Sequence, residues 1–460
     1  MQDANLRLDA ISEMLALSSF GNGKNIIFCG LDLKGPMDLQ AFHEASRQSV
    51  TDFPHFVSTI REIKINGRYH LVRQHSPDLP SWFGVQELKI RESSASLLDN
   101  ILYTLSPRLD RDWDLFQELP LEMHLIRVSE RHHVLAIFFH HVAGDVGSLM
   151  EFAQVFMANY HELFTGQPPD WKHEPLPVSS SRKAPVEKKQ EKSQAWLDRV
   201  GGTLSGFLRP PAIPLGNGDR GNDEQYHIKR VLSPRDSQEL AGSKGRACAS
   251  LPDRLTAATH LAVDQWNRER GIGPGTLTTS MTVNMRGRYK DLDNPNNSAL
   301  IFLRSLPHER RNPNEFCRLL AMQRVRRFRT QSDSSYYQNL QRFNNTFRIL
   351  PFHLRRRLVS FVMNKHQVSV AITPLGVLWP TLQEGRPTGE TFLKKSGALD
   401  VTEVHGIGYK LASNTRLLLV AYAFRDQVNL ILTSSASLFT RQESEQFMDL
   451  IMENLLHSAL

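Results

Sequence analysis

Apolar and polar positions along the chain switch repeatedly between the two-residue period of a strand and the 3.6-residue period of a helix. Residues 25–38 predict a strand and a Gly-Pro turn, and residues 39–50 predict the helix that follows. Two apolar runs, 121–128 and 134–139, lie close enough to form a hairpin. Residues 149–163 then place apolar side chains at helical spacing. This part of the chain therefore predicts strands and helices in alternation.

The second part of the chain repeats the alternation. Residues 226–232 and 277–288 predict strands, and residues 251–268, between them, predict a helix with its apolar side chains on one face. Near the end, residues 417–433 predict a hairpin and residues 440–455 a capped helix. The pattern as a whole predicts an α/β (or α+β) fold.

A polar stretch divides these two series of elements. Residues 166–192 are rich in Pro, Ser, Lys and Glu and carry no hydrophobic periodicity, which is typical of a linker. A chain of 460 residues is long for a single core, so two units of about 200 residues are expected. We predict an N-terminal lobe at residues 1–180 and a C-terminal lobe at residues 181–460.

Composition is that of an ordinary globular protein, with 40% hydrophobic and 22% charged residues. The sequence contains no apolar run of membrane-spanning length and no signal pattern at its start, so we expect a cytoplasmic protein. Cys29, Cys248 and Cys317 are scattered without metal-ligand spacing. This predicts neither a disulfide framework nor a zinc site.

The net charge of +7 is concentrated in one segment. Residues 308–357 contain twelve Arg and three acidic residues. Arg beside Phe and Leu suits contact with an acidic protein, with phosphates or with anionic lipid, although a solvated helix face has the same composition. The sequence shows no recognisable nucleic-acid-binding motif, so no nucleic-acid partner is expected.

The strongest chemical signal is an adjacent histidine pair at the end of a predicted strand. His140 and His141 follow the apolar run 134–139, and the chain then turns at Gly144 and places a carboxylate at Asp145. Histidine can take and return a proton near neutral pH, and a buried carboxylate nearby can hold the loop in place. The sequence therefore predicts a general-base site. The alternative is a polar pair that only caps the edge of a sheet.

The residues on either side of this pair also carry predictions. Ser148 and Glu151 form a capping-box pattern, which predicts that Ser148 caps the next helix. A second pair, His132 and His133, falls in the predicted turn between two strands and has no carboxylate at the matching distance. We expect this second pair to be exposed to solvent.

The segment HHVAGDVGS, residues 140–148, resembles the HHxxxDG motif of the condensation-domain superfamily, which is related to chloramphenicol acetyltransferase. By this resemblance His141 is the base or the residue that positions the nucleophile, His140 supports the loop, and Asp145 is the structural aspartate. Val146 stands where the motif has Gly, and Gly147 comes one place later. Because Val is β-branched, the turn is expected either to differ from a Gly-built one or to be strained.

Weaker resemblances extend along the chain. KGPMD, residues 34–38, is similar to the "kGplD" segment of condensation domains. The strand 277–288, with Asn284 and Arg286 near its end, resembles their "pvnlR" strand, and residues 294–297 resemble the "GN" turn after it. Thr373-Pro374 departs from the "SNlG" element of the superfamily.

The resemblance implies a fold and a reaction. The fold is two chloramphenicol-acetyltransferase-like lobes arranged in a V, with mixed sheets flanked by helices and a tunnel between the lobes. His141 accepts a proton from an amine or hydroxyl that attacks a thioester, on coenzyme A or on the phosphopantetheine arm of a carrier protein. Asp145 pairs with an arginine, Arg286 or else Arg288. No cofactor or metal is bound, because the acyl-CoA or phosphopantetheinyl thioester is a substrate.

Three functions remain open at this point. The first is a stand-alone condensation-type acyltransferase of natural-product biosynthesis that uses an acyl or peptidyl carrier protein. The second is an ester-forming enzyme of the wax-ester or diacylglycerol type that uses acyl-CoA, with the basic and apolar residues 343–363 on a membrane surface. The third is a non-catalytic relative that binds a carrier protein.

Overall fold

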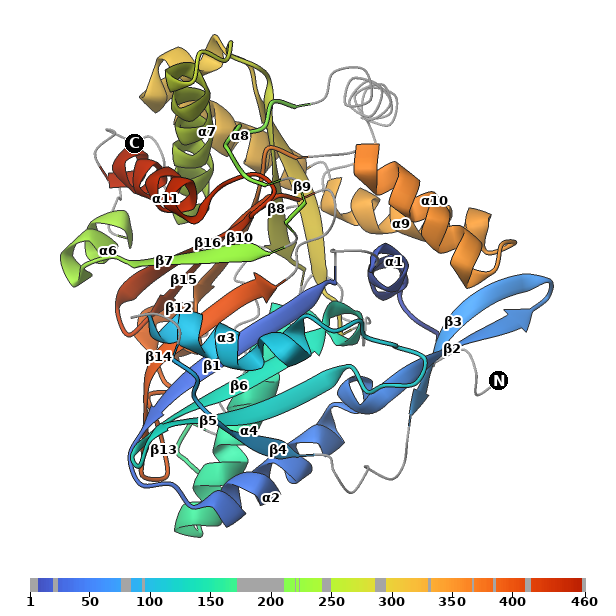
Figure 1. The fold of residues 1–460 in the computed structure, drawn as a ribbon, viewed down its shortest axis with the longest axis vertical. Helices are drawn as coiled ribbons and strands as arrows, with labels where there is room; N and C mark the ends of the chain where they lie inside the picture. Colours follow the sequence, from blue (N-terminus) through green and yellow to red (C-terminus); the bar gives the residue numbers. More distant parts are fainter. Residues whose placement is uncertain are drawn as a thin grey trace.

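Two six-stranded sheets form the framework of the computed structural model (Figure 1). In spatial order the first sheet contains β13 (Lys395–Ser396), β14 (Leu399–Tyr409), β1 (Ile26–Lys34), β6 (His132–His140), β5 (Leu121–Ser129) and β4 (Val85–Lys89). The second contains β7 (Gln225–Val231), β16 (Gln427–Ser435), β15 (Leu417–Phe424), β10 (Val370–Val377), β8 (Leu277–Asn284) and β9 (Ser298–Ser305). The structure describes residues 7–19, 24–75, 84–92, 96–171, 211–219, 221–222, 224–241, 250–285, 295–329, 332–365, 368–383, 386–409 and 415–456.

Both sheets are mixed. Most neighbouring strands are antiparallel, but β4 pairs in parallel with β5, and β10 runs parallel to β8 and β15. Two hairpins stand apart from the sheets: β2 (Ser58–Ile65) with β3 (Arg68–His75), and β11 (Pro380–Gln383) with β12 (Arg386–Thr391). The predicted α/β class, with mixed sheets, is confirmed.

Helices cover the sheets. They are α1 (Ala10–Ser18), α2 (Leu39–Ser49), α3 (Leu97–Leu109), α4 (Val146–Thr165), α6 (Pro234–Ala241), α7 (Leu251–Glu269), α8 (Pro313–Arg329), α9 (Ser332–Phe347), α10 (Phe352–Lys365) and α11 (Arg441–Leu456). Short 3₁₀ turns occur at η2 (Val50–Asp52), η3 (Pro54–Val57), η4 (His141–Ala143) and η5 (Glu309–Arg311). Figure 1 shows α3 and α4 on opposite sides of the first sheet. Among the described residues, no helix is both long enough and apolar enough to cross a membrane.

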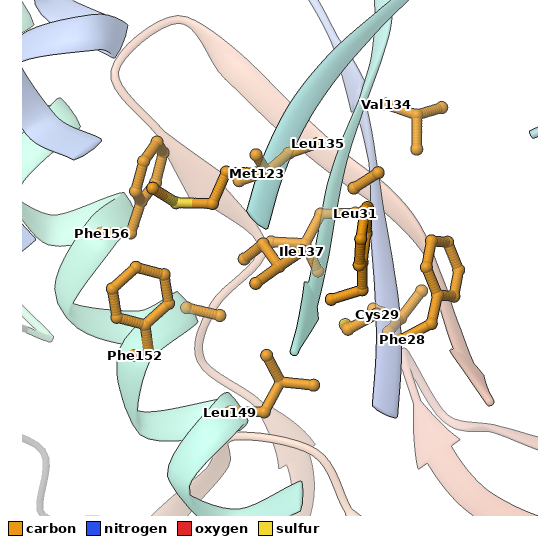
Figure 2. Close-up of a cluster of buried hydrophobic side chains, with 14 of the residues drawn as sticks. Phe28, Cys29, Leu31, Met123, Val134, Leu135, Ile137, Leu149, Phe152 and Phe156 are labelled. Carbon is orange, nitrogen blue, oxygen red and sulfur yellow. The ribbon is translucent and has the colours of Figure 1, made fainter. Parts of the chain in front are cut away.

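Strand β6 lies in the middle of the first core, which explains its unbroken apolar run. Every residue from 134 to 139 is fully buried. Figure 2 shows Leu135 and Ile137 facing Phe152 and Phe156 of α4, whereas Val134 lies on the other side of the sheet. A strand covered on both faces has no polar face to show, so its sequence reads as continuous hydrophobic residues.

The first sheet draws on distant parts of the chain. Strand β14 pairs with β1 along its length, from Ile26 opposite Tyr409 to Lys34 opposite Asp400. The sheet therefore combines four strands from before residue 180 with β13 and β14 from near the C-terminal end. The division into residues 1–180 and 181–460 stays a prediction, because residues 172–210 around the boundary lie outside the described ranges.

One prediction about the cysteines is wrong. Cys317, a buried residue of α8 in the second core, is disulfide-bonded. Cys29 is a free thiol in the first core, and burial raises its pKa to about 12. Cys248 lies outside the described residues. Spacing along the sequence did not reveal the disulfide because bond formation depends on the separation of the two residues in space.

Candidate active site

The histidine motif lies at the junction of β6 and α4. The strand ends at His140, η4 makes one tight turn, and α4 begins at Val146. Asp145 is the N-cap of α4, and its Oδ1 accepts the backbone N–H of Ser148 at 3.1 Å. The predicted cap at Ser148 is therefore wrong by three residues, because an aspartate earlier in the chain already satisfies the first turn.

His140 is an internal support of this junction. Its ring is buried, Nδ1 accepts the backbone N–H of Val142 at 3.1 Å, and Nε2 lies 2.6 Å from Oγ of Ser19. Because Nδ1 accepts, Nε2 carries the proton and donates to Ser19. Burial, together with the nearby charge of His141, lowers the pKa of His140 to about 3. His140 is thus neutral at physiological pH and fully engaged within the protein.

His141 is only partly buried, unlike its neighbour. Its backbone N–H donates to the carbonyl of Asn25 at 2.8 Å, and its backbone carbonyl accepts from Nδ2 of Asn296 at 2.9 Å. The ring atom Nδ1 lies 3.1 Å from Oδ1 of the same asparagine. Sequence reasoning placed Asn296 in the turn before β9 but did not anticipate this contact with the motif.

Asp145 fastens the motif to the second sheet. Its carboxylate is buried, and Oδ2 accepts the backbone N–H of Asn297 at 2.9 Å and the hydroxyl of Ser298 at 2.8 Å. The hydroxyl of Ser148 donates to the carbonyl of Pro295 at 2.6 Å, which adds a second link between the same two segments. Since Ser298 begins β9, the carboxylate joins the two sheets at the site.

The sequence predicted an ion pair between Asp145 and an arginine. Arg286 and Arg288 lie outside the described residues, so the proposed ion pair stays a prediction. Asn284, the last residue of β8, is described, and it stands opposite Ser298 in the β8–β9 pairing with its side chain exposed. The structure thus brings Asn284 close to the segment that Asp145 holds.

The small residues of the loop have distinct roles. Gly144 has extended backbone angles that any residue could adopt, but a Cβ there would lie 2.8 Å from Cβ of Ser148. Val146 is the first helical residue of α4 and does not have a positive φ, so of the two predicted alternatives, a different turn or strain, the backbone strain does not arise. Gly147 is the second residue of that helix. Val fits the motif position because the helix starts there.

Two other elements hold the turn from outside. The guanidinium of Arg73, on β3, donates to the carbonyl of Val142 at 2.8 Å. From α1, the hydroxyl of Ser12 accepts the second N–H of the Asn296 amide at 2.9 Å. Neither contact was anticipated, since nothing in the local sequence around residues 12 and 73 marks a site.

Four arginines of the basic segment 308–357 form ion pairs inside the protein. Arg310 pairs with Asp264 at 2.8 Å, and Arg324 pairs with Asp253 at 2.6 Å. Arg348 and Arg355 both pair with Glu13, which is fully buried on α1. These four arginines are therefore structural. On α10 and the turn before it, Ile349 and Phe361 are 63% and 60% exposed, and Arg356 and Arg357 are exposed beside them.

The expectation that His132 and His133 are exposed is wrong. The turn between β5 and β6 is formed by residues 130 and 131, so both histidines belong to the strand. Nε2 of His132 lies 2.6 Å from Oδ1 of Asp32, and His133 is buried. The apolar run alone did not show how far the strand extends.

A second titratable cluster surrounds Asp32 at the far end of β1 from the motif. Asp32, Glu403 and His405 bring possible ligand atoms within 4.8 Å of one another. The ammonium of Lys229 donates to Glu403 and to the carbonyl of residue 404. Burial first, and then the charge of Lys229, lowers the pKa of His405 to about 3. Glu403 therefore already has a cationic partner, and the cluster is a partly buried ion-pair network.

Among the comparisons with known proteins, the solved structures show the fold. No family model matches the chain. The isonitrile lipopeptide synthase of Mycobacterium tuberculosis is 32% identical over 89 residues, which is 19% of this chain and 4% of that much longer protein. Solved structures, in contrast, match over almost the whole chain.

A trichothecene 15-O-acetyltransferase from Fusarium sporotrichioides matches with a TM-score of 0.65 and 13% identity, covering 98% of this chain and 94% of that one. A variant of the starter condensation domain of rhizomide synthetase, in complex with C8-CoA and Leu-SNAC, matches with a TM-score of 0.61 and 14% identity over 99% and 96% of the two chains. The X-domain from teicoplanin biosynthesis matches with a TM-score of 0.56 and 16% identity over 98% and 94%.

Matches of this extent and this identity establish the architecture. The chain has the fold of condensation domains and chloramphenicol-acetyltransferase-like acyltransferases, and the resemblance drawn from its motif is confirmed at that level.

Proposed function

We propose that the chain is an acyltransferase that moves an acyl group from a thioester to an amine or a hydroxyl. The observation that carries this proposal is the contrast within the motif. His140 and Asp145 are buried and hydrogen-bonded within the protein, whereas His141 is only partly buried and has its backbone fixed on both sides. A rigidly held, accessible imidazole suits proton transfer.

The chemistry needs no covalent intermediate on the protein. The nitrogen or oxygen of the acceptor attacks the thioester carbonyl carbon while His141 takes the acceptor's proton. The C–S bond then breaks, and the departing sulfur receives that proton, so that the products are an amide or ester and a free thiol. A positioned base contributes about 10²–10⁴-fold to such a step, and alignment of the two substrates contributes further.

The first turn of α4 suits stabilisation of the developing oxyanion. Val146 and Gly147 begin this helix directly after the motif, so their backbone N–H groups stand at its positive end. Asp145 keeps this turn in place through its bond to Ser148. A tunnel between the two sheets, through which donor and acceptor meet at His141, is part of the proposal.

For the donor, we propose an acyl or peptidyl carrier protein, as in a stand-alone condensation domain, with acyl-CoA as the alternative. The structural matches include an O-acetyltransferase and a condensation domain solved in complex with C8-CoA, so acyl-CoA is tested beside the carrier thioester. The purified chain is incubated with acyl-CoA or with an acyl-carrier thioester and a pool of amines and alcohols, and products are identified by mass.

The decisive comparison uses two histidine variants. We expect His141→Ala to lower transfer about 10²–10⁴-fold, the range of a lost general base. His43→Ala is the matched control, because His43 is a half-exposed residue of α2 that pairs with Glu87. The control should keep full activity. Undiminished turnover by the His141 variant would remove this residue from the chemistry.

A second candidate function is recruitment of a partner protein without catalysis. It is favoured by the match to an X-domain whose structure was also solved in complex with OxyB. Absence of product with both donors, together with binding of a carrier protein, would establish this alternative over transfer.

Membrane contact is proposed only for the ester-forming alternative. Its support is the exposed pair Ile349 and Phe361 beside Arg356 and Arg357. Sedimentation of the chain with anionic but not neutral liposomes, reduced by Phe361→Ser, is the expected result. Equal recovery in the supernatant with both liposome types would refute it.

A further inference from the structure

We propose that Asn296 is a positioning residue that fixes the tautomer of His141, so that Nδ1 carries the proton and Nε2 is the free acceptor. The inference deepens the proposed function and rests on it for its catalytic meaning. The tautomer itself is derived only from the hydrogen bonds that join Asn296 to His141 and to Ser12.

The orientation of the Asn296 amide follows from its neighbours. One amide atom lies 2.9 Å from the backbone carbonyl oxygen of His141, which can only accept a hydrogen bond. The atom at that position must therefore be Nδ2. The same nitrogen lies 2.9 Å from Oγ of Ser12, so both of its hydrogens are directed.

The hydroxyl of Ser12 independently supports this orientation of the Asn296 amide. Its hydroxyl is buried and donates its single hydrogen to Oδ2 of Asp9, the N-cap of α1. Since that hydrogen is already committed, Oγ of Ser12 can only accept from Asn296. Asn296 therefore donates to Ser12, and Ser12 donates to Asp9, in a chain of hydrogen bonds that leads away from the motif.

The remaining atom of the amide determines the state of the histidine. Oδ1 of Asn296 has no hydrogen, and it lies 3.1 Å from Nδ1 of His141. A neutral imidazole has one donor and one acceptor nitrogen, and the bond made by one nitrogen sets the role of the other. Nδ1 must donate to Oδ1, because the other tautomer would oppose two lone pairs in a buried place. No residue in the described part of the chain bonds Nε2, so its lone pair is then available to take a proton.

This assignment makes the base depend on three distant segments. His141 follows a strand of the first sheet, Asn296 precedes a strand of the second, and Ser12 lies on α1. Asn296 touches no reacting atom in this scheme. It acts by holding the ring in one orientation and one protonation pattern, which is the role that outer hydrogen-bond partners have for other functional histidines.

The direct test is a nuclear magnetic resonance measurement of the ring nitrogens. The full chain is labelled with ¹⁵N-histidine, and the signals of His141 are identified by their loss in His141→Ala. At a pH where the His141 ring is neutral, the ¹⁵N chemical shift of Nδ1 should be that of a protonated ring nitrogen. The ¹⁵N chemical shift of Nε2 should be that of an unprotonated one. Asn296→Ala should abolish this pattern, whereas Asn159→Ala, which removes a different part-buried amide bonded to Ser49, should leave it unchanged.

Kinetics supply a second readout that a purely structural role would not reproduce. Asn296→Ala should lower kcat about 10- to 100-fold with little change in KM. Asn296→Asp retains an acceptor for Nδ1 and adds a negative charge, so activity should be partly restored and the acidic limb of the pH profile should move to higher pH. Thermal melting shows whether each variant is folded.

The outcomes separate this inference from the proposed function. If no donor supports transfer but Nδ1 is protonated in the wild-type chain and not in Asn296→Ala, the proposed function fails and the tautomer assignment stands. If transfer occurs while Nε2 carries the proton, or if Asn296→Ala changes neither the ring signals nor kcat, the assignment of Asn296 is overturned.

Discussion

Replacing Asp145 by Ala should weaken the fold much more than replacing His141, although the two residues belong to one motif. The Asp145 carboxylate is buried and accepts hydrogen bonds from the backbone of Ser148, the backbone of Asn297 and the hydroxyl of Ser298. The first bond caps α4, and the other two tie the motif to β9. An alanine would leave all three donors without this acceptor.

The loss in the free energy of unfolding can be worked out from these contacts. Loss of an aspartate N-cap costs about 0.5–2 kcal/mol. A buried donor that loses its partner costs about 1–3 kcal/mol, and Asp145→Ala removes the acceptor of two further donors that are partly buried, Asn297 and Ser298. We expect the free energy of unfolding to fall by about 3–5 kcal/mol in total, since the loop can relax in part. His141→Ala removes one ring hydrogen bond of a partly buried residue and should cost about 1 kcal/mol.

Urea denaturation followed by tryptophan fluorescence measures both values. Asp449→Ala is the matched control for removal of an aspartate, because Asp449 is a largely exposed residue paired with Arg230 on the surface. That change should cost about 0–1 kcal/mol. If Asp145→Ala unfolds at the same urea concentration as the wild type, the structural role assigned to this carboxylate is incorrect.

Three further perturbations test other parts of the structure. Gly144→Ala would place a Cβ 2.8 Å from Cβ of Ser148 and should cost about 1–3 kcal/mol of stability and reduce transfer, which the same urea experiment and activity assay detect. Glu13→Gln removes the counter-charge that the buried Arg348 and Arg355 share, and leaves Arg355 only its pair with Glu62 at 3.1 Å, so it should cost about 3–5 kcal/mol, whereas Glu445→Gln on the surface should change the urea midpoint little. Because burial lowers the pKa of His140 from 6.5 to about 3, the unfolded chain binds a proton that the folded chain does not. Stability should therefore rise with pH between about 3 and 6.5, by up to about 1.4 kcal/mol per unit from this group, and a slope equally steep in His140→Gln would contradict the assignment.

Local signals in the sequence predicted the main elements well. The apolar run of β6 and the helical spacing of α4 are both observed, because burial on one or two faces leaves a direct mark on the order of residues. The capping box at the last helix is also observed: Thr440 and Glu443 exchange hydrogen bonds between side chain and backbone.

Other local signals were present and were not used. Asn66-Gly67 joins β2 to β3, and both residues have positive φ, as a tight hairpin turn requires. This dipeptide could have identified the hairpin. The wrong boundary at His132 has a similar origin, because strand ends depend on pairing with neighbours as well as on hydrophobicity.

The contacts that complete the site could not be predicted in this way. Asn296 is 155 residues from His141 in the chain, and Ser12 lies 284 residues from Asn296. Nothing in the spacing of one segment indicates which amide will meet which ring across two sheets. Motif resemblance located the histidine, but its hydrogen-bond partners emerge only from the packing of the whole chain.

The pairing of β14 with β1 limits how this protein can be recombined with others of its fold. A chimera joined at residue 180 would set β1 of one parent against β14 of the other, along a seam in which residues 26–33 of β1 are all buried. Transplanting residues 1–180 together with 395–409 keeps that seam within one parent. Modules of this architecture are therefore exchanged more safely as interlaced pieces than as a single contiguous block.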